Sequence, residues 1–362
     1  MKIDFIISSI YGGGAERVLA IIANTLAKKK SYEVSIITLN KGNDKYDIDK
    51  SINRVRLEHG TIPNHTVRGF VNLCKYYFRK KNRPDLIISF LTLNNFLAII
   101  VAKLYSIKII AEEHNSHLRF INNRKATSNF TKKYLYKRAD LLTVLTSYDL
   151  SYYENFGVNV YVMPNPCSFV PIKTNTHSRE KIILAVGNLN RYHHKGFDNL
   201  IELIAPILKK NSDWKLKIAG SGDKGLPILK ELIEQFGIDS QVIFTGFVSN
   251  ISDIMHKSSI YILPSRYEGL PMVLLEAMSQ GMACIAYDCI TGPADIITDH
   301  VNGFLIEDQN KEAMQRKLQI LIDDDSLRNR FATQSLKSLD KYHINSIIKR
   351  YENIFDRLLL KK

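Results

Sequence analysis

The sequence predicts an α/β fold of two doubly wound, parallel-sheet domains that face a central cleft. Three observations support this prediction. The chain has 362 residues, enough for two domains that each bury a core. Short apolar runs alternate with helical patterns along most of the chain, as in βαβ units with right-handed crossovers. A polar, proline-rich stretch at Met163–Ser178 interrupts this alternation and predicts a linker.

The first half of the chain predicts one doubly wound sheet, and we assign residues 1–165 to the first domain. The expected strands are Lys2–Ser9, Tyr32–Leu39, Asp85–Phe90, Lys108–Glu112 and Leu141–Leu145. The expected helices are Glu16–Lys30, Val67–Lys81, Asn94–Tyr105 and Thr127–Arg138.

The alternation restarts after the linker and predicts a second domain at residues 179–342. Its expected strands are Lys181–Val186, Lys215–Ala219, Gln241–Phe244, Ile260–Leu263 and Ala283–Ala286. Its expected helices are Phe197–Lys209, Lys224–Phe236, Met272–Ser279 and those from Lys311 onward. We expect residues 343–362 to form a C-terminal helix that packs back on the first domain. Ligands of such sheets bind at the carboxyl ends of the strands.

Positive charge is concentrated in the first half. The net charge of the chain is +14, of which residues 1–170 contribute +12. Within residues 65–138 the only acids are Asp85, Glu112 and Glu113. A positive surface of this kind fits an anionic partner, namely a membrane surface, a lipid phosphate or a nucleic acid. The alternative is a basic surface that only keeps the protein soluble.

Composition excludes several protein classes. The longest apolar run, Phe96–Tyr105, is interrupted by Lys103 and is too short to span a bilayer. The first residues lack the pattern of a signal peptide. The four cysteines form no CxxC pair and no disulfide framework, which favours a reducing cytoplasm.

Two turns contain the candidate binding elements. Gly12, Gly13 and Gly14 join the first strand to the first helix, where backbone N–H groups suit an anion. In the segment SRYEGLPMVLLEAMSQGMACIA, Glu268 lies in a loop, and Glu276 follows eight positions later within an expected helix. A carboxylate in so apolar a stretch needs a partner, and ionised glutamates suit sugar hydroxyls.

These residues resemble the E-x7-E motif of the retaining glycosyltransferases of family 4, which have the GT-B fold of two Rossmann-like domains. The resemblance extends over the glycine turn with AERV, His114, the PNP linker, the Lys195–Gly196 turn and the GPADII segment Gly292–Ile297. In detail the chain is most similar to bacterial transferases that build lipid-linked glycans, O-antigen or capsule units.

The resemblance implies a role for each candidate residue. Glu276 would hold the ribose of a nucleotide-sugar donor, whereas Glu268, with the N–H groups of Gly269 and Leu270, would hold the donor sugar. Lys195 would bind the diphosphate, over which Gly13 and Gly14 would close, and His114 would lie near the sugar. The family commonly has an arginine directly after the glycine of this strand end, but Asn188 follows Gly187 here. Arg191 is the candidate to supply that charge.

We expect neither a metal nor any other required cofactor. Asp47 and Asp49 match the DxD pattern of metal-using transferases, but their polar surroundings favour an exposed turn. His193 and His194 are neighbours without further ligands at matching spacing. Fixed cations and a helix N-terminus suffice to stabilise a departing nucleoside diphosphate.

A basic face is expected on the helix Val67–Lys81. Arg68, Lys75 and Arg79 recur at spacings of seven and four, and Tyr76, Tyr77 and Phe78 accompany them. Such a face fits a lipid pyrophosphate or anionic headgroups near the first domain's ligand-binding edge. The alternative is an ordinary solvated helix face.

The sequence therefore predicts a cytoplasmic enzyme, peripheral at the inner face of the plasma membrane. It would transfer a hexose or N-acetylhexosamine from a nucleotide diphosphate sugar, in particular a UDP-sugar, to a lipid-linked glycan. The product would serve surface polysaccharide or glycoprotein glycan biosynthesis. One alternative is a UDP-N-acetylglucosamine 2-epimerase on the same architecture. Another is a non-catalytic nucleic-acid-binding protein, for which no known sequence signature is present, so we expect no nucleic-acid partner.

Overall fold

The computed structural model describes residues 1–118, 125–173 and 178–359. The chain divides into two compact units, each described by itself below. The first unit contains residues 1–166 and 342–362, and the second contains residues 167–341. Positions 174–177 of the expected linker and 360–362 of the expected C-terminal helix lie outside the described residues.

The described residues of the first unit form one sheet of seven parallel strands in the order β3-β2-β1-β4-β5-β6-β7. The order reverses between β1 and β4, so the loops that follow these two strands diverge at the carboxyl edge of the sheet. The strands are β1 (Lys2–Ile7), β2 (Glu33–Thr38), β3 (Asn53–Arg56), β4 (Leu86–Phe90), β5 (Lys108–Glu112), β6 (Leu141–Val144) and β7 (Val160–Val162).

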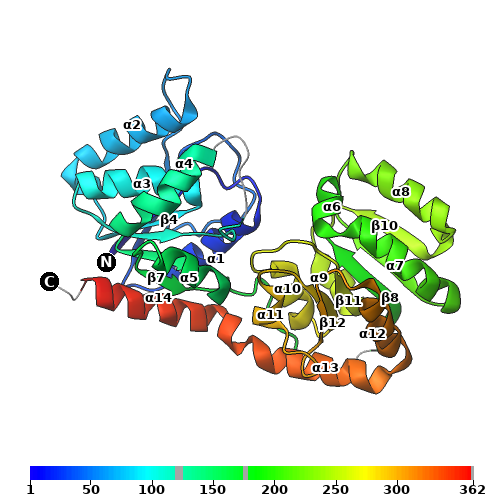
Figure 1. The fold of residues 1–362 in the computed structure, drawn as a ribbon. Helices are drawn as coiled ribbons and strands as arrows, with labels where there is room; N and C mark the ends of the chain where they lie inside the picture. Colours follow the sequence, from blue (N-terminus) through cyan, green and yellow to red (C-terminus); the bar gives the residue numbers. More distant parts are fainter. Residues whose placement is uncertain (119–124, 174–177, 360–362) are drawn as a thin grey trace. The chain divides into compact units, whose positions relative to one another are not determined.

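Helices cover this sheet (Figure 1). The apolar side chains between the sheet and these helices are buried. The helices are α1 (Gly14–Ala27), α2 (His65–Phe78), α3 (Thr92–Leu104), α4 (Lys125–Phe130), α5 (Leu150–Glu154) and α14 (Ile344–Leu359). The last helix, α14, comes from the far end of the chain and packs on α1. Its apolar face buries Ile347, Ile348, Tyr351, Ile354 and Phe355.

The second unit is also doubly wound. Its described residues form a sheet of six parallel strands in the order β10-β9-β8-β11-β12-β13, with the switch point between β8 and β11. The strands are β8 (Glu180–Val186), β9 (Lys215–Ala219), β10 (Val242–Gly246), β11 (Ser258–Leu263), β12 (Ala283–Asp288) and β13 (Phe304–Glu307). The helices are α6 (Tyr192–Lys195), α7 (Phe197–Lys210), α8 (Gly225–Phe236), α9 (Ile251–Lys257), α10 (Met272–Ser279), α11 (Pro293–Ile296), α12 (Lys311–Asp323) and α13 (Asp325–Ser338).

The α/β prediction is confirmed, and the differences from it are local. β3 and β7 are short outer strands with exposed or half-buried residues, so they lack the apolar run that marks a central strand. The expected helix Thr127–Arg138 is split into α4, a π-helical turn at 131–135 and a 3-10 turn at 136–138. No helix among the described residues combines the length and apolarity needed to cross a membrane.

Candidate active site

Lys195 and Glu268 meet at the switch point of the second sheet. Lys195 ends α6, which follows β8, and Glu268 lies in the loop between β11 and α10. The Lys195 Nζ lies 2.8 Å from the Glu268 Oε1, and the Ser265 hydroxyl donates to the same oxygen at 2.6 Å. Both charged side chains are largely shielded from solvent. The two residues that the resemblance places on the donor's diphosphate and sugar therefore form one ion pair.

The ion pair keeps Glu268 ionised despite its burial. Burial alone disfavours the carboxylate, but the charge of Lys195 and the hydrogen bonds from Lys195 and Ser265 hold the pKa of Glu268 below its ordinary value. A fixed carboxylate beside a fixed ammonium presents both an acceptor and a positive charge to a ligand.

A glycine allows the two loops to approach so closely. Gly196 adopts a left-handed backbone with φ of 69°, and a Cβ there would collide with the carbonyl oxygen of Pro264. Pro264 directly follows β11, so this contact seats the α6–α7 turn against the loop that contains Glu268. Only glycine tolerates both the conformation and the distance.

The rest of the E-x7-E segment continues from Glu268 into α10. Within the described residues, the backbone N–H groups of Gly269 and Leu270 donate to no protein acceptor, so both are available to a ligand. Glu276 lies on α10 with only 2% of its surface exposed. Gly292 packs directly on the Gly269 carbonyl and has φ of 95°, so the GPADII segment braces this loop.

The glycine turn lies at the switch point of the first sheet. Gly13 is the N-cap of α1, and Gly14 is its first residue. The Tyr46 hydroxyl lies 3.2 Å from the Gly13 amide nitrogen and donates to the Gly13 carbonyl oxygen at 3.0 Å. A Cβ at Gly14 would meet nothing within 4 Å, so the turn is open on that side.

His114 follows β5 at the same carboxyl edge. Its ring stacks on Phe90 with centroids 4.7 Å apart. Its Nε2 lies 3.2 Å from the Glu112 Oε2, and Glu112 in turn accepts a hydrogen bond of 2.6 Å from the Tyr351 hydroxyl. Because a carboxylate only accepts, Nε2 is assigned a proton, and in the neutral imidazole Nδ1 is then an acceptor. Nδ1 is buried and has no partner within the described residues.

Two family models match successive parts of the chain. Residues 12–168 match the model described as Glycosyltransferase Family 4, and residues 170–338 match Glycosyl transferases group 1. An uncharacterized glycosyltransferase of Haemophilus influenzae is 32% identical over 360 residues, covering 98% of this chain and 99% of that protein. The chain belongs to the glycosyltransferases of family 4.

A second relative and a solved structure are also similar to this glycosyltransferase. An N-acetyl-D-galactosaminyltransferase of Campylobacter jejuni, named for a glycan on diphospho-undecaprenol, is 29% identical over 355 residues, covering 96% of each chain. A mutant of the S. aureus protein TarM, solved with UDP among its ligands, superposes with a TM-score of 0.79 at 16% identity over 98% of this chain and 99% of that one. The latter likeness supports the GT-B fold.

In this glycosyltransferase Arg191 is exposed and lies beside His194, with its Nη2 2.7 Å from the His194 Nε2. No contact among the described residues joins Arg191 to Lys195 or Glu268. His193 lies 2.9 Å from Asp198, which also accepts from Arg266 at 2.7 Å. His193 and Arg266 thus contact Asp198, whereas Arg191 contacts His194. The sequence prediction included neither Asp198 nor Arg266.

The expected helix Val67–Lys81 ends early, with Arg79 as its C-cap residue. Helix α2 ends at Phe78, because the side chains of Asn82 and Arg83 donate to the carbonyls of Tyr76 and Tyr77 and close the helix. Arg79 has an extended backbone at the C-cap.

The three cations also lie at different levels of the first unit. Just beyond Arg79, the Lys81 carbonyl accepts a hydrogen bond from the side chain of Lys2, at the start of β1 and therefore at the amino edge of the sheet. Arg68, near the other end of α2, donates to the Ile62 carbonyl at 3.3 Å. Gly69, next to it, faces Leu39 just after β2, at the carboxyl edge. Only Arg68 therefore lies near the glycine turn's edge of the sheet.

The three aromatic residues at the C-terminal end of α2 differ in their exposure to solvent. Tyr77 is buried and donates to Asp4 at 2.8 Å, and Tyr76 packs partly against the core. Phe78 is 74% exposed beside the exposed Lys75 and Arg79. The exposed basic and aromatic surface is therefore confined to the C-terminal end of α2.

Asp47 and Asp49, which match the DxD pattern, lie in a loop with hydrogen bonds to Asn24 and Ser51. Asp49 accepts hydrogen bonds from the backbone and side chain of Ser51, and the Asp47 carbonyl accepts one from Asn24. Among the described residues, no three His, Cys, Asp or Glu side chains gather in an arrangement that could hold a metal ion.

Sequence reasoning missed Ser265, Tyr46 and Tyr351. Ser265 precedes Glu268 by three positions, and that spacing in a loop was an available signal. Tyr46 and Tyr351 reach their partners across 33 and 239 positions, so no local pattern identifies them.

Proposed function

We propose that this protein is a retaining glycosyltransferase that moves a hexose or N-acetylhexosamine from a UDP-sugar to a lipid-linked glycan. The observation that carries the proposal is the shielded Lys195–Glu268 pair beside the unused N–H groups of Gly269 and Leu270. This arrangement offers a cation to a diphosphate, and it offers a carboxylate and N–H donors to sugar hydroxyls.

The chemistry develops negative charge on the departing diphosphate. The bond between the anomeric carbon and the diphosphate oxygen breaks while the acceptor hydroxyl oxygen bonds to that carbon from the same face. The acceptor proton passes to the departing oxygen. Lys195 stabilises the departing charge, and it is already held in place by Glu268, so little reorganisation is needed. Retention is checked by the anomeric configuration of the product in NMR, and an inverted product contradicts it.

We propose that fixed cations perform this task without a metal. Lys195 supplies the charge in the second unit. Added EDTA should therefore leave turnover unchanged, whereas a loss restored by Mg²⁺ or Mn²⁺ would show that a metal shares the work.

A similar protein and the charge of the first unit support a lipid-linked acceptor. The Campylobacter jejuni relative is named for a glycan on diphospho-undecaprenol, and a diphosphate fits the excess of positive charge in residues 1–170. The buried, unpartnered Nδ1 of His114 suits a sugar hydroxyl as donor. We place the enzyme at the inner face of the membrane on the same grounds.

The Lys195→Ala variant tests the proposed function. Turnover should fall by at least about a hundredfold, the scale for removing one preorganised charge-stabilising group. Lys311→Ala is the matched control, because Lys311 forms an exposed ion pair with Glu202 in the same unit. Transfer is measured with UDP-sugars and a diphospho-polyprenol glycan. Equal turnover in the two variants would remove Lys195 from the diphosphate site.

A further inference from the structure

The loop between β2 and β3 lies against the glycine turn along much of its length. The Lys45 amide donates to the Ile10 carbonyl at 2.9 Å, and the Lys45 ammonium lies 4.5 Å from the centre of the Tyr11 ring. A Cβ at Gly42 would contact Ser9 and Tyr11. Residues 42–46 therefore form one wall of the turn.

Tyr46 makes the most specific contact of this wall. Its hydroxyl contacts both backbone polar groups of Gly13, at 3.2 Å from the nitrogen and 3.0 Å from the carbonyl oxygen. Gly12, one residue earlier, has φ of 131°, a conformation open to glycine and rarely to other residues. A chain segment with several glycines is costly to order, so an external group that fixes Gly13 restricts the whole turn.

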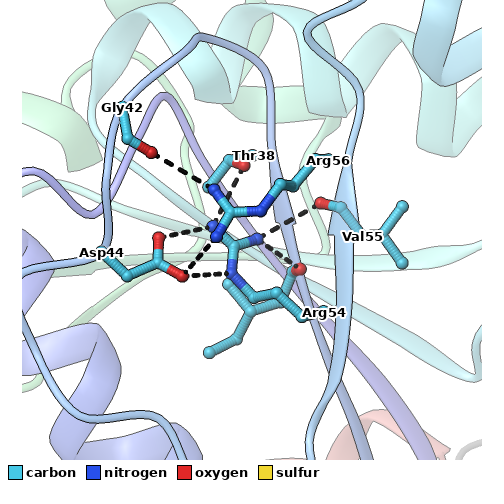
Figure 2. A network of polar contacts seen from close by, with 7 residues as sticks. Thr38, Gly42, Asp44, Arg54, Val55 and Arg56 are labelled. Atoms are coloured by element: carbon cyan, nitrogen blue, oxygen red, sulfur yellow. Dashed lines mark hydrogen bonds and ion pairs between the residues drawn. The ribbon is translucent and has the colours of Figure 1, made fainter.

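A network of ion pairs and hydrogen bonds fixes the loop at Asp44, two residues before Tyr46 (Figure 2). Asp44 accepts from the Arg54 Nε at 3.1 Å and Nη2 at 3.0 Å, and from the Arg56 Nη2 at 2.9 Å. Arg54 also donates to the Thr38 hydroxyl and the Ile36 and Val55 carbonyls, and Arg56 donates to the Gly42 carbonyl. Asp44 is thereby joined to β3 directly and to β2 through Arg54.

The electrostatics favour the ionised form of Asp44, which these ion pairs need. Burial disfavours the charge of Asp44, but the hydrogen bonds and charges of Arg54 and Arg56 hold its pKa below its ordinary value. A carboxylate with two bidentate-capable guanidinium partners is among the stronger surface ion pairs.

The side chain of Asn24 fixes the loop beyond Tyr46. It donates to the Asp47 carbonyl at 2.8 Å and accepts from the Asp49 amide at 2.9 Å. Asn24 lies on α1, the helix that the glycine turn begins. Tyr46 therefore lies between two anchors, one on the sheet and one on the helix.

From this arrangement we infer that Tyr46 is a positioning residue of the transfer reaction, and that Asp44 acts through it. The inference rests on the proposed function and on the glycine turn of the first unit binding a phosphate group of a substrate during transfer. Tyr46 holds Gly13 and Gly14 in the conformation that this binding requires. Because the nucleotide is bound by the second unit, the effect of Tyr46 falls on turnover and not on nucleotide affinity.

The test is the Tyr46→Phe variant, which keeps the ring and removes both hydrogen bonds to Gly13. We expect kcat to fall about tenfold, the scale of one or two lost hydrogen bonds. The dissociation constant of UDP by calorimetry should stay within about twofold, because the proposed nucleotide contacts of Lys195, Glu268 and Glu276 lie in the second unit. Tyr161→Phe is the matched control, since Tyr161 is a partly exposed tyrosine of β7 in the same unit.

Asp44→Asn tests the anchor separately. It should lower kcat in the same direction, and combining it with Tyr46→Phe should add little, because both changes act on one contact. Full additivity would mean that Asp44 does not act through Tyr46. A variant that lowers Tm while kcat per folded enzyme stays unchanged would reduce Tyr46 to a stabilising contact, which overturns the inference.

Different results would contradict the proposed function and this inference. If Lys195→Ala abolishes transfer while Tyr46→Phe retains full kcat, the function stands and the positioning role is wrong. If Lys195→Ala is fully active, the proposed diphosphate site is wrong whatever Tyr46 does.

Discussion

Asp4 is a carboxylic acid inside the core of the first unit. It lies on β1 with none of its surface exposed, and its Oδ2 accepts a hydrogen bond of 2.8 Å from Tyr77. Its Oδ1 has no partner within the described residues. Burial raises the pKa of Asp4 to about 6, against the hydrogen bond from Tyr77 and the charge of Lys2. Between about pH 4 and pH 6, Asp4 therefore keeps its proton in the folded state and loses it in the unfolded state.

This shift makes the Asp4 contribution to stability pH-dependent. A raised folded-state pKa means that the contribution is complete below the unfolded value near 4 and is lost as the pH rises through 6. A shift of this size corresponds to about 3 kcal/mol between pH 4 and pH 8. Asp4→Asn should remove that loss, so its advantage over the unmodified protein in urea unfolding should grow from pH 5 to pH 8. A pH-independent difference would contradict the buried titration.

Glu276 gives a second prediction at the scale of one residue. If it holds the ribose hydroxyls of the donor, Glu276→Gln should weaken UDP binding by roughly 1.5 to 3 kcal/mol, the value of hydrogen bonds to a charged group. Calorimetry measures this, with Glu307→Gln at the exposed end of β13 as control. Unchanged affinity in Glu276→Gln would exclude the ribose role.

Individual residues were predictable where local spacing carries the chemistry. Glu268, Gly269 and Glu276 are identified by eight positions of sequence, and the structure buries Glu276 on α10. The partner of Glu268 was not predictable, because Lys195 is 73 positions away and reaches it only through the close approach at Gly196. Tyr46 lies in a polar stretch whose composition suggests only an exposed turn.

At the scale of elements, alternation of apolar and polar residues predicted the central strands and long helices. It failed at helix ends and outer strands, where a few side chains decide the outcome. α2 continues to Lys81 by its pattern, but Asn82 and Arg83 cap it at Phe78. The early end leaves Arg79 at the C-cap of α2.

The structure of α2 separates two predictions about its charges. Lys75 and Arg79 are exposed beside Phe78, so they are the candidates for anionic headgroups. Changing both to glutamine should weaken binding to anionic liposomes by about 1 kcal/mol per charge, and less at high salt.

Arg68→Gln should spare liposome binding and impair transfer, because Arg68 lies near the carboxyl edge of the first sheet. Co-sedimentation and transfer assays across a salt series check both, and UDP affinity should stay constant in all variants. Unchanged sedimentation of the double variant would make this an ordinary solvated surface.

At the scale of the molecule, the chain passes between its two units twice, at 166–167 and at 341–342. Two sheets were predictable from the repeated βαβ pattern, because each repeat is local. The contacts of the last helix were not predictable in detail, since α14 meets α1 and β5 across more than 200 positions, as the Tyr351–Glu112 hydrogen bond shows. The aromatic and aliphatic residues along α14 indicate only that one face is buried.

That contact connects the end of the chain to the candidate active site. The Tyr351 hydroxyl donates to one oxygen of Glu112, and the other oxygen of Glu112 lies 3.2 Å from His114. Glu112 is almost wholly buried, so loss of the Tyr351 hydroxyl leaves part of a buried carboxylate without its donor. The imidazole of His114 depends on that carboxylate for its orientation.

Tyr351→Phe should therefore affect both stability and transfer. We expect a loss of about 1.5 to 3 kcal/mol in the free energy of unfolding, the cost of removing a hydrogen bond to a buried charged group. Turnover should fall severalfold at a temperature where the variant is fully folded, because Glu112 relaxes and His114 loses its fixed orientation. Tyr153→Phe is the control: Tyr153 is also buried in the first unit, but its hydroxyl has no partner within the described residues. Its loss should cost little. If both variants lose equal stability and neither loses turnover, α14 supports the first unit by packing alone and has no part in positioning His114.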